Sequence, residues 1–150
     1  MIVNVEAGTS NASLATLLRL ASALHVSLAS LVEDSVEDAG PTVTRPAGRT
    51  PLWIGTNGGT AVMVASADTP DMLELWDWTL EPGDEYRSPA HRPGTHELIH
   101  VLRGRLRLTV GTHAYELRAG DAISLEAIEP HSYACAGRTA TRFTMTVLEP

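Results

Sequence analysis

The chain has 150 residues and a formal net charge of −7 at pH 7, which allows one well-buried core with a small appendage but not two ordinary domains. The acidic balance excludes a protein whose whole surface binds phosphate backbones, and the single cysteine, Cys135, excludes an internal disulfide framework. No apolar run approaches the roughly 20 residues of a membrane span, and the N-terminus lacks a signal-peptide pattern. The composition therefore predicts a cytoplasmic protein with no membrane partner.

The first part of the chain has the periodicity of a helix. Its apolar residues recur mostly at steps of three and four, at Leu14, Leu17, Leu18, Ala21, Leu24, Leu28, Leu31 and Val32. Ser13 is placed to cap a helix from Leu14 to about Leu24. Ser27 is placed to cap a second, short helix that ends near Glu33. Because short helices are marginal alone, we expect this stripe to pack on the rest of the chain, to pack on a second copy, or to fray.

The pattern changes twice after the helices. Residues 34–50 combine two prolines, two glycines and five charges with few large apolar groups, which indicates a linker. From Pro51 onward, about nine short apolar or alternating runs are separated by turn residues, which predicts an antiparallel sandwich or barrel. These runs are LWIG, TAVMVAS, MLELWDWTL, ELIHVL, RLRLTV, HAYEL, AISLE, HSYAC and RFTMTVL. We therefore expect a helical segment at 1–33, a linker at 34–50 and a β-domain at 51–150.

The stretch HRPGTHELIHVLRG, residues 91–104, contains three of the six histidines. Alternation along a strand from Glu97 gives it the same inward face as Ile99 and Val101, and gives His96, Leu98 and His100 the opposite face. His91 precedes a Pro-Gly turn and could return to the mouth of the cavity that Glu97 faces. A third group is offered by His131, at the start of a later strand.

These residues resemble the two cupin motifs. In the first motif, one or two histidines precede a glutamate that is followed seven residues later by a glycine, and Glu97 and Gly104 have that spacing. Gly120 and His131, eleven apart, resemble the first and last anchors of the second motif. The resemblance covers about 70–150. It implies a mainly β chain, with a cupin-type antiparallel β-barrel (double-stranded β-helix) after a short N-terminal helical segment.

The chain also departs from the metal-binding cupin pattern. A second histidine is replaced by Pro93, and the usual proline and glycine of the second motif are replaced by Glu126 and Ile128. The remaining set is His91, Glu97 and His131. Two histidines and one carboxylate suit one divalent zinc, iron or manganese ion with open coordination positions. Loss of one of four ligands also typifies cupins that hold an organic ligand without metal, so both alternatives stay open.

Other side chains are candidates for binding a small molecule or for filling the core. Trp78 and Tyr133 are candidate ligand-binding residues beside the His-Glu-His set. Trp78 shares a strand face with Trp76, and we expect core packing to be the main role of this pair. We expect the remaining histidines to be surface or partly buried imidazoles: His25, His96, His100 and His113.

Residues 3–34 resemble the C-terminal half of the XRE, or lambda-repressor-like, helix-turn-helix domain. Glu6-Ala7-Gly8 matches the Glu-x-Gly step that ends the recognition helix of that family, and Ala12 replaces a usual proline. The first two helices and the base-reading positions of the family have no counterpart in this sequence. With a formal charge of −1 over 1–33, we expect DNA binding only if those helices are supplied, and no DNA-binding residue is predicted.

Together, the two resemblances imply a transcriptional regulator, not an enzyme, in which a cupin domain senses a small-molecule effector and forms a homodimer. The alternative is a small metal-dependent cupin enzyme of the oxygenase or isomerase type, with Glu126, Tyr133 and His100 as acid or base candidates. A third interpretation is a short partner that dimerises with a full-length regulator without contacting DNA. The regulator interpretation predicts that residues 51–150 bind the ligand by themselves.

Overall fold

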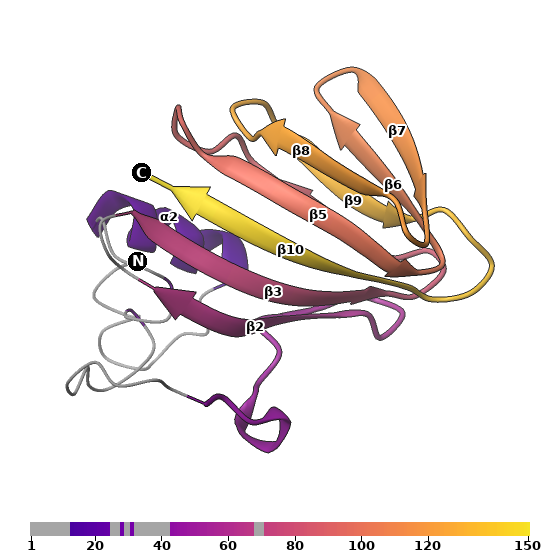
Figure 1. The fold of residues 1–150 in the computed structure, drawn as a ribbon, viewed down its shortest axis with the longest axis horizontal. Coiled ribbons are helices and arrows are strands. Elements are labelled where there is room, and N and C mark those ends of the chain that lie inside the picture. Colours follow the sequence, from indigo (N-terminus) through magenta and orange to yellow (C-terminus); the bar gives the residue numbers. More distant parts are fainter. Residues whose placement is uncertain (1–12, 25–27, 29–30, 32–42, 68–70) are drawn as a thin grey trace.

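The computed structural model describes residues 13–24, 28, 31, 43–67 and 71–150. This part of the chain forms one longer helix, one 3-10 turn and ten strands (Figure 1). The elements are α2 (Leu14–Leu24), η1 (Pro46–Gly48), β1 (Trp53–Ile54), β2 (Thr60–Ala67), β3 (Met72–Leu80), β4 (Glu85–Ser88), β5 (His96–Arg103), β6 (Arg105–Val110), β7 (His113–Arg118), β8 (Ala122–Glu126), β9 (His131–Cys135) and β10 (Thr141–Glu149). The predicted mainly β fold is confirmed. No helix among the described residues is long and apolar enough to cross a membrane.

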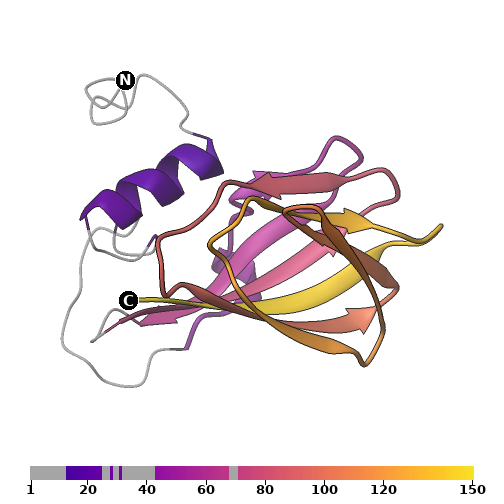
Figure 2. The ribbon, with the colours of Figure 1, turned by 90° about the horizontal axis from the view of Figure 1, so that it is seen from above.

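Two antiparallel sheets face each other across the core. The larger sheet has the strand order β1-β2-β3-β10-β5-β8, and the smaller has the order β4-β9-β6-β7. Figure 2 looks along the space between the two sheets and shows α2 at one end of the barrel. Because successive side chains of a strand point to opposite faces, each strand contributes every second residue to the interior.

Strand β5 follows the predicted alternation. Glu97, Ile99 and Val101 are buried, whereas His96, Leu98 and His100 are exposed. The strand lies between β10 and β8, with Ile99 opposite Met145 and Ile123. This central position in the larger sheet fixes the register of Glu97, so its carboxylate lies in the barrel interior.

Two of the motif glycines have a physical role in turns. Gly104 joins β5 to β6 with φ +79°, and a Cβ there would lie 2.6 Å from the carbonyl oxygen of Ala140. Only glycine fits without displacing that backbone. Gly120 has φ +93°, and the next residue, Asp121, accepts a hydrogen bond from the backbone N–H of Arg118 at 2.8 Å. The Asp121 side chain therefore stabilises this turn.

Strand β4 is the element that the sequence pattern did not predict. Its residues, EYRS, include a single large apolar side chain, too few for a recognisable alternation. It pairs with β9, so that Tyr86 lies opposite Tyr133 and Ser88 lies opposite His131. The turn before β4 is held by the Asp84 carboxylate, which accepts three backbone N–H bonds at 2.8 to 3.1 Å. As a result, Tyr86 and Ser88 lie beside the predicted site.

Helix α2 forms where the periodicity predicted it. The Ser13 hydroxyl accepts a hydrogen bond from the backbone N–H of Thr16 at 3.3 Å, as expected of the N-cap. Leu14 and Ala21 are buried, and Leu14 belongs to the same hydrophobic cluster as the barrel core. Among the three outcomes considered for the apolar stripe, the structure has the one in which it packs on the barrel.

The segment after α2 is attached to the barrel by a buried carboxylate. Leu28 is fully buried, and its backbone N–H donates to Oε1 of Glu74 on β3 at 3.1 Å. The other carboxylate oxygen, Oε2, accepts the indole N–H of Trp76 at 3.0 Å. The predicted cap at Ser27, the end near Glu33, the Glu6-Ala7-Gly8 step and residues 34–42 of the predicted linker lie outside the described residues.

Candidate metal and ligand site

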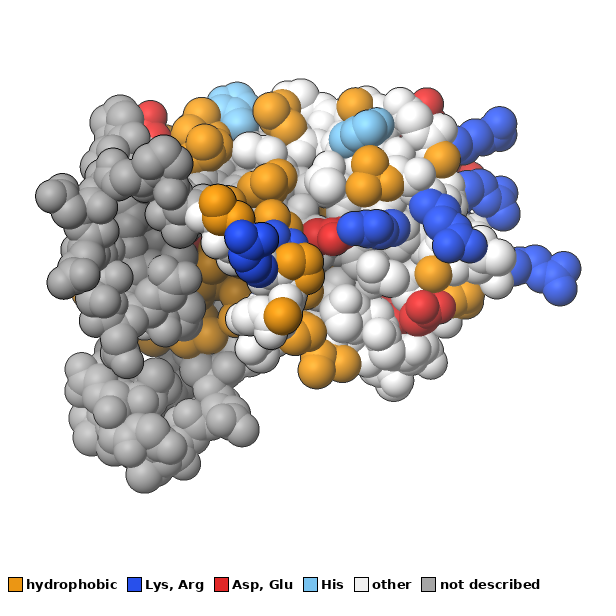
Figure 3. Space-filling model, turned by 60° about the horizontal axis from the view of Figure 1, so that its bottom comes forward, with side chains coloured by type: hydrophobic (Ala, Val, Ile, Leu, Met, Phe, Trp, Pro, Cys, Tyr) orange, Lys and Arg blue, Asp and Glu red, His pale blue; other side chains and the backbone are white. Residues whose placement is uncertain are grey.

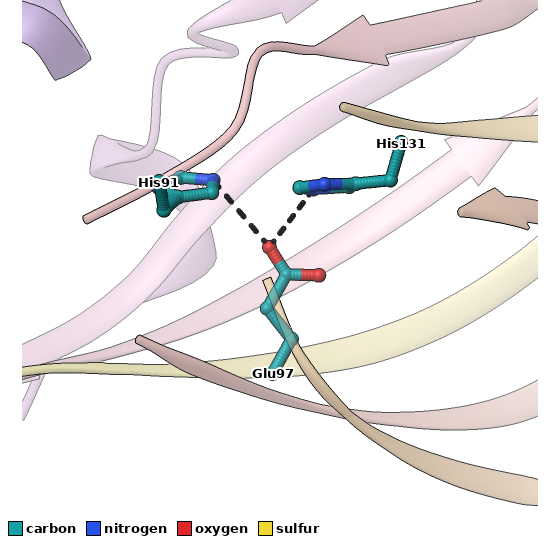
Figure 4. A group of neighbouring side chains, drawn as sticks. All are labelled: His91, Glu97 and His131. Atoms are coloured by element: carbon teal, nitrogen blue, oxygen red, sulfur yellow. Dashed lines mark ion pairs between the residues drawn. The ribbon is translucent and has the colours of Figure 1, made fainter. Parts of the chain in front are cut away.

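Three side chains from separate parts of the chain converge inside the barrel (Figure 4). His91 comes from the loop after β4, Glu97 from β5, and His131 is the first residue of β9. Oε1 of Glu97 lies 3.3 Å from Nε2 of His131 and 3.7 Å from Nε2 of His91. The ligand atoms of all three lie within 4.8 Å of one another. The structure thus brings together the set that the motif spacing predicted, while its role as a ligand set stays a prediction.

The surrounding groups orient this set. Nδ1 of His131 lies 2.8 Å from the carbonyl oxygen of Glu129, and because a carbonyl can only accept, Nδ1 carries the proton. When the ring is neutral, the lone pair of Nε2 therefore faces Glu97. Oε2 of Glu97 accepts a short hydrogen bond from the hydroxyl of Tyr133. Hydrogen bonds of this kind, made by the atoms of a ligand side chain that do not face the metal, fix the tautomer and the orientation of metal ligands.

His91, the member of the set that lies in a loop, is also held in place by neighbouring groups. The backbone N–H of His91 donates to the carbonyl oxygen of Ala127 at 2.8 Å, and Nε2 of His91 lies 3.2 Å from the Ser88 hydroxyl. The imidazole rings of His91 and His131 are stacked with centroids 5.5 Å apart. The unpredicted strand β4 thereby contributes to positioning a predicted site residue.

Burial and the Glu97 carboxylate together set the electrostatics of the pocket. Burial lowers the pKa of His91 below its ordinary value, only partly offset by the attraction of Glu97. Burial acts in the same direction on His131, but Glu97 and the Glu129 carbonyl together raise the pKa of this imidazole above its ordinary value. Burial, reinforced by Glu97, raises the pKa of Tyr86 to about 12 and raises the pKa of Tyr133 well above its ordinary value. Both phenols are therefore neutral hydrogen-bond donors at physiological pH.

The donor set fits a divalent transition metal. Nε2 of His131 is buried and lies 3.3 Å from Oε1 of Glu97, but the two atoms do not have the geometry of a hydrogen bond, although a buried polar atom normally makes one. Ligands about 2.1 Å from one ion are separated by about 3 to 4 Å, close to the 3.3 and 3.7 Å found here. Two imidazoles and one carboxylate would leave coordination positions open. The residues therefore have the chemistry and approximate spacing of a three-ligand centre.

A pocket adjoins the set and extends to α2. Its walls come from both sheets and from the helix: Leu14, Leu18, Ala21, Met72, Glu74, Trp76, Trp78, Tyr86, Ser88, His91, Glu97, Tyr133, Met145, Val147 and Glu149. The cavity volume is about 30 Å³, which is room for about two water molecules. In this conformation α2 closes one side of the pocket, so a larger ligand requires the walls to move.

Some predicted residues lie in this pocket and others do not. Trp78 and Tyr133 line it, whereas His100 and Glu126 are exposed outside it. The expectation of surface imidazoles is confirmed for His96, His100 and His113, which are exposed, and His25 lies outside the described residues. The prediction that residues 51–150 bind the ligand by themselves stays a prediction, and the pocket wall includes Leu14, Leu18 and Ala21 besides residues of that range.

Sequence reasoning missed several pocket residues, above all Glu74, Tyr86, Ser88 and Glu149. One of them had a signal in the sequence. Glu74 has the same strand parity as Trp76 and Trp78, so a carboxylate was to be expected on the buried face of that run. Tyr86 and Ser88 had none, because β4 itself is not recognisable from its residues.

Comparison with known families agrees with the fold. The family model of the cupin domain matches residues 76–147, the region that contains the whole His-Glu-His set. Together with the two antiparallel sheets, this match identifies the architecture as a cupin fold with one short helix packed on it. A quercetin 2,3-dioxygenase from Bacillus subtilis is 38% identical over 72 residues, which are 48% of this chain. The chain spans only 21% of the length of that relative.

Solved structures of regulators are also similar to this chain. The crystal structure of an HTH_3 family transcriptional regulator from Vibrio cholerae matches 100% of this chain and 79% of its own length, with a TM-score of 0.73 and 25% identity. The cupin domain of an XRE family transcriptional regulator from Enterobacter cloacae matches 61% of this chain and 97% of its own length, with a TM-score of 0.58 and 18% identity. The second likeness concerns the fold alone.

Proposed function

We propose that this chain carries the small-molecule sensor of a transcriptional regulator, and that the effector binds in the pocket between the cupin barrel and α2. The observation that carries this proposal is the wall formed by Leu14, Leu18 and Ala21. These residues belong to the segment that resembles a helix-turn-helix domain, so an effector in the barrel would contact that segment directly. The likeness of the whole chain to the Vibrio cholerae regulator supports the same arrangement.

The mechanism follows from the size of the cavity. An effector of ordinary metabolite size does not fit a volume of about 30 Å³, so its binding favours a conformation in which α2 has shifted. A ligand moves such an equilibrium by its difference in affinity for the two conformations. Glu74 lines the pocket and also accepts a hydrogen bond from the backbone of Leu28, which follows α2. This carboxylate therefore links the pocket wall to the helical segment.

The pocket chemistry supports a particular class of effector. Most of its wall is apolar or aromatic, including Met72, Met145 and Val147. Trp78 Nε1 and the Tyr86 hydroxyl are buried donors without a hydrogen-bond partner in the described part of the chain. Buried donors without partners destabilise a protein by about 1–3 kcal/mol each. A small, mainly apolar molecule with a carbonyl or carboxylate oxygen would supply the missing acceptor.

In this proposal, His91, Glu97 and His131 would hold one divalent transition metal, which would supply a Lewis acid for such an oxygen. The side chains of the protein orient the effector and exclude water from it. In this proposal, the chain binds DNA only when the first two helices of a helix-turn-helix domain are supplied, and pairing of chains sets the spacing of two DNA-binding segments. Effector binding and DNA binding are then coupled through α2.

A binding screen tests the proposal. The full chain is titrated with short-chain carboxylic acids, ketones and alcohols while tryptophan fluorescence is recorded, since two of its three tryptophans line the pocket. We expect at least one compound to change the emission and to raise the melting temperature. A matched pair of variants provides the control: Tyr86→Phe should weaken binding, and Tyr115→Phe, exposed on β7, should not. A panel without any binder would contradict the sensor proposal.

The second candidate is a small metal-dependent enzyme of the oxygenase or isomerase type. It is favoured by the convergence of the three metal-ligand side chains next to a pocket and by the partial match to a dioxygenase. Measuring conversion of the bound compound, with and without a metal chelator, separates the two candidates. An enzyme converts the compound and loses this activity when the chelator removes the metal. A sensor leaves the compound unchanged with or without metal.

A further inference from the structure

The ligand pocket has three buried carboxylates on one wall. Glu74 on β3, Glu97 on β5 and Glu149 on β10 all line it and are 4, 1 and 6% exposed. The strand register gathers them, because Val147 on β10 lies opposite both Glu74 and Glu97. Glu149 follows two positions later on the same face of the strand. Diagonal neighbours of this kind have Cα atoms about 7–8 Å apart, so two long carboxylate side chains can reach one bound group.

The permanent positive charges lie away from this wall. Figure 3 shows basic side chains gathered at one end of the molecule. The exposed Arg105 and Arg118 lie opposite each other there, and Arg103 lies opposite Arg142 near the start of β10. Glu149 ends the same strand, about 23 Å farther along it. The chain has no lysine, and no arginine is among the described residues that line the pocket. The resulting field favours cations at the pocket end of the barrel.

The Glu149 carboxylate can accept further hydrogen bonds. Its Oε1 atom is buried and accepts none in the described part of the chain. Nε of Arg92, in the loop after β4, lies 3.0 Å from Oε1 but without the geometry of a hydrogen bond. Arg92 does not line the pocket, so it meets the carboxylate from outside. Because a buried carboxylate oxygen without hydrogen bonds is unfavourable, a charged donor in the pocket would stabilise Glu149.

The aromatic wall of the pocket points to the same kind of ligand. Ring centroids of Trp76 and Trp78 are 6.1 Å apart, and those of Trp78 and Tyr86 are 5.0 Å apart. Faces of indole and phenol rings attract cations. Independently of the carboxylates, Nε1 of Trp78 and the hydroxyl of Tyr86 are buried donors without a partner in the described part of the chain. The pocket thus offers sites for a cation and for an acceptor oxygen.

We infer that the effector is a small primary amine, protonated at neutral pH, that also carries a carbonyl or carboxylate oxygen. Its ammonium group binds between Glu74 and Glu149, since Glu97 belongs to the predicted metal set. An ammonium has three donors, and a carboxylate has about four acceptor sites. Glu74 therefore keeps room for it beside the hydrogen bonds from Leu28 and Trp76. The inference rests on the proposed sensor function and adds the chemical class of the effector.

Isothermal titration calorimetry of the full chain tests the inference with pairs of compounds that differ only in the amine. The pairs are free leucine and isocaproic acid, free valine and isovaleric acid, and aminoacetone and acetone. We expect the amine of at least one pair to bind about tenfold more tightly than its partner, because hydrogen bonds to charged groups are stronger than neutral ones. Glu149→Gln should remove most of this preference. The matched control, Glu116→Gln, removes an exposed carboxylate that pairs with Arg107 at 3.2 Å and should preserve it.

Circular dichroism checks that Glu149→Gln is folded, and the comparison within each pair needs no variant. The inference is overturned if the compounds without an amine bind as tightly as their partners, or if the folded Glu149→Gln chain keeps the full preference. In both cases the pocket still binds a small molecule, so the sensor proposal stands. A chain that binds neither these compounds nor any in the fluorescence panel contradicts the sensor proposal and this inference together.

Discussion

Nε2 of His131 lies 3.3 Å from Oε1 of Glu97, although His131 begins a strand of the smaller sheet and Glu97 lies in a strand of the larger one. This contact joins β9 of the smaller sheet to β5 of the larger one across the barrel. It forms because Glu97 occupies an inward position of β5 while the hydrogen bond from Nδ1 to the Glu129 carbonyl turns the other ring nitrogen of His131 toward it. Together with His91, the pair forms the predicted metal-ligand set of the pocket.

Elemental analysis of the purified protein checks this site. We predict about one equivalent of zinc, iron or manganese per chain, because three nitrogen and oxygen donors converge on one position. The double variant His91→Ala, His131→Ala should contain none. The matched control, His96→Ala with His100→Ala, removes two exposed histidines of β5 and should retain the metal. Unmodified protein that stays metal-free after incubation with each ion would refute this prediction.

Tyr133→Phe tests the support of the carboxylate ligand. The tyrosine hydroxyl donates to Oε2 of Glu97 inside the barrel, and loss of such a contact typically lowers metal affinity by about 10- to 100-fold. Competition with a zinc chelator measures the change. Tyr115→Phe, at an exposed position of β7, serves as the control. Equal affinities in the two variants would mean that the Tyr133 hydrogen bond does not support metal binding by Glu97.

Glu74→Gln tests the attachment of the helical segment to the barrel. The amide cannot accept hydrogen bonds through both of its polar atoms, so either Leu28 N–H or Trp76 Nε1–H loses its acceptor. We predict a decrease of about 1–3 kcal/mol in the free energy of unfolding, measured by urea denaturation. Trypsin should also cleave faster after Arg19, the only basic residue before Arg45. Glu116→Gln, on the exposed face of β7, should change neither quantity.

Asp84→Asn has a predicted pH dependence. Burial opposes ionisation, but the backbone N–H groups of Asn57, Gly59 and Glu81 lower the pKa of the Asp84 carboxyl below its unfolded value of 3.8. A carboxyl whose pKa is lowered in the folded state stabilises the protein at pH values above its unfolded pKa. This stabilisation is lost as the pH falls through the folded pKa. We therefore expect the variant to be about 2–3 kcal/mol less stable at pH 7.

The stability difference between the unmodified chain and Asp84→Asn should shrink as the pH falls below about 4, where the carboxylate begins to be protonated. Urea denaturation at pH 7, 5 and 3.5 measures this trend. A difference that stays constant over the series would show that the charge of Asp84 is not what holds the turn.

Much of this fold could be predicted from periodicity. The helix from Leu14 to Leu24, the inward parity of Glu97 and nine of the strands follow from alternation or from steps of three and four. Those patterns are local, and burial of one face enforces them. The positions of His91 and His131 beside a turn and at a strand start made them candidates to join Glu97, and the resemblance to the cupin motifs supported this set, because periodicity does not say which strands meet.

The elements that could not be predicted depend on tertiary contacts. Strand β4 exists because its backbone completes the edge of the smaller sheet beside β9, not because of its side chains. The position of α2 over the pocket depends on the fit of Leu14, Leu18 and Ala21 to the barrel. An apolar stripe shows that a helix must be covered but does not identify its partner.

The central claim is that an effector in the pocket acts on α2, and the rate of tryptic cleavage after Arg19 tests it most directly. A compound that binds against Ala21, which is 1% exposed, should slow cleavage at saturating concentration, because cleavage requires α2 to open. Ala21→Leu fills the pocket wall and should abolish this protection. Ala23→Leu makes the same change on the exposed side of the helix and should preserve it. A compound that changes tryptophan fluorescence but leaves the cleavage rate unaltered would contradict the claim.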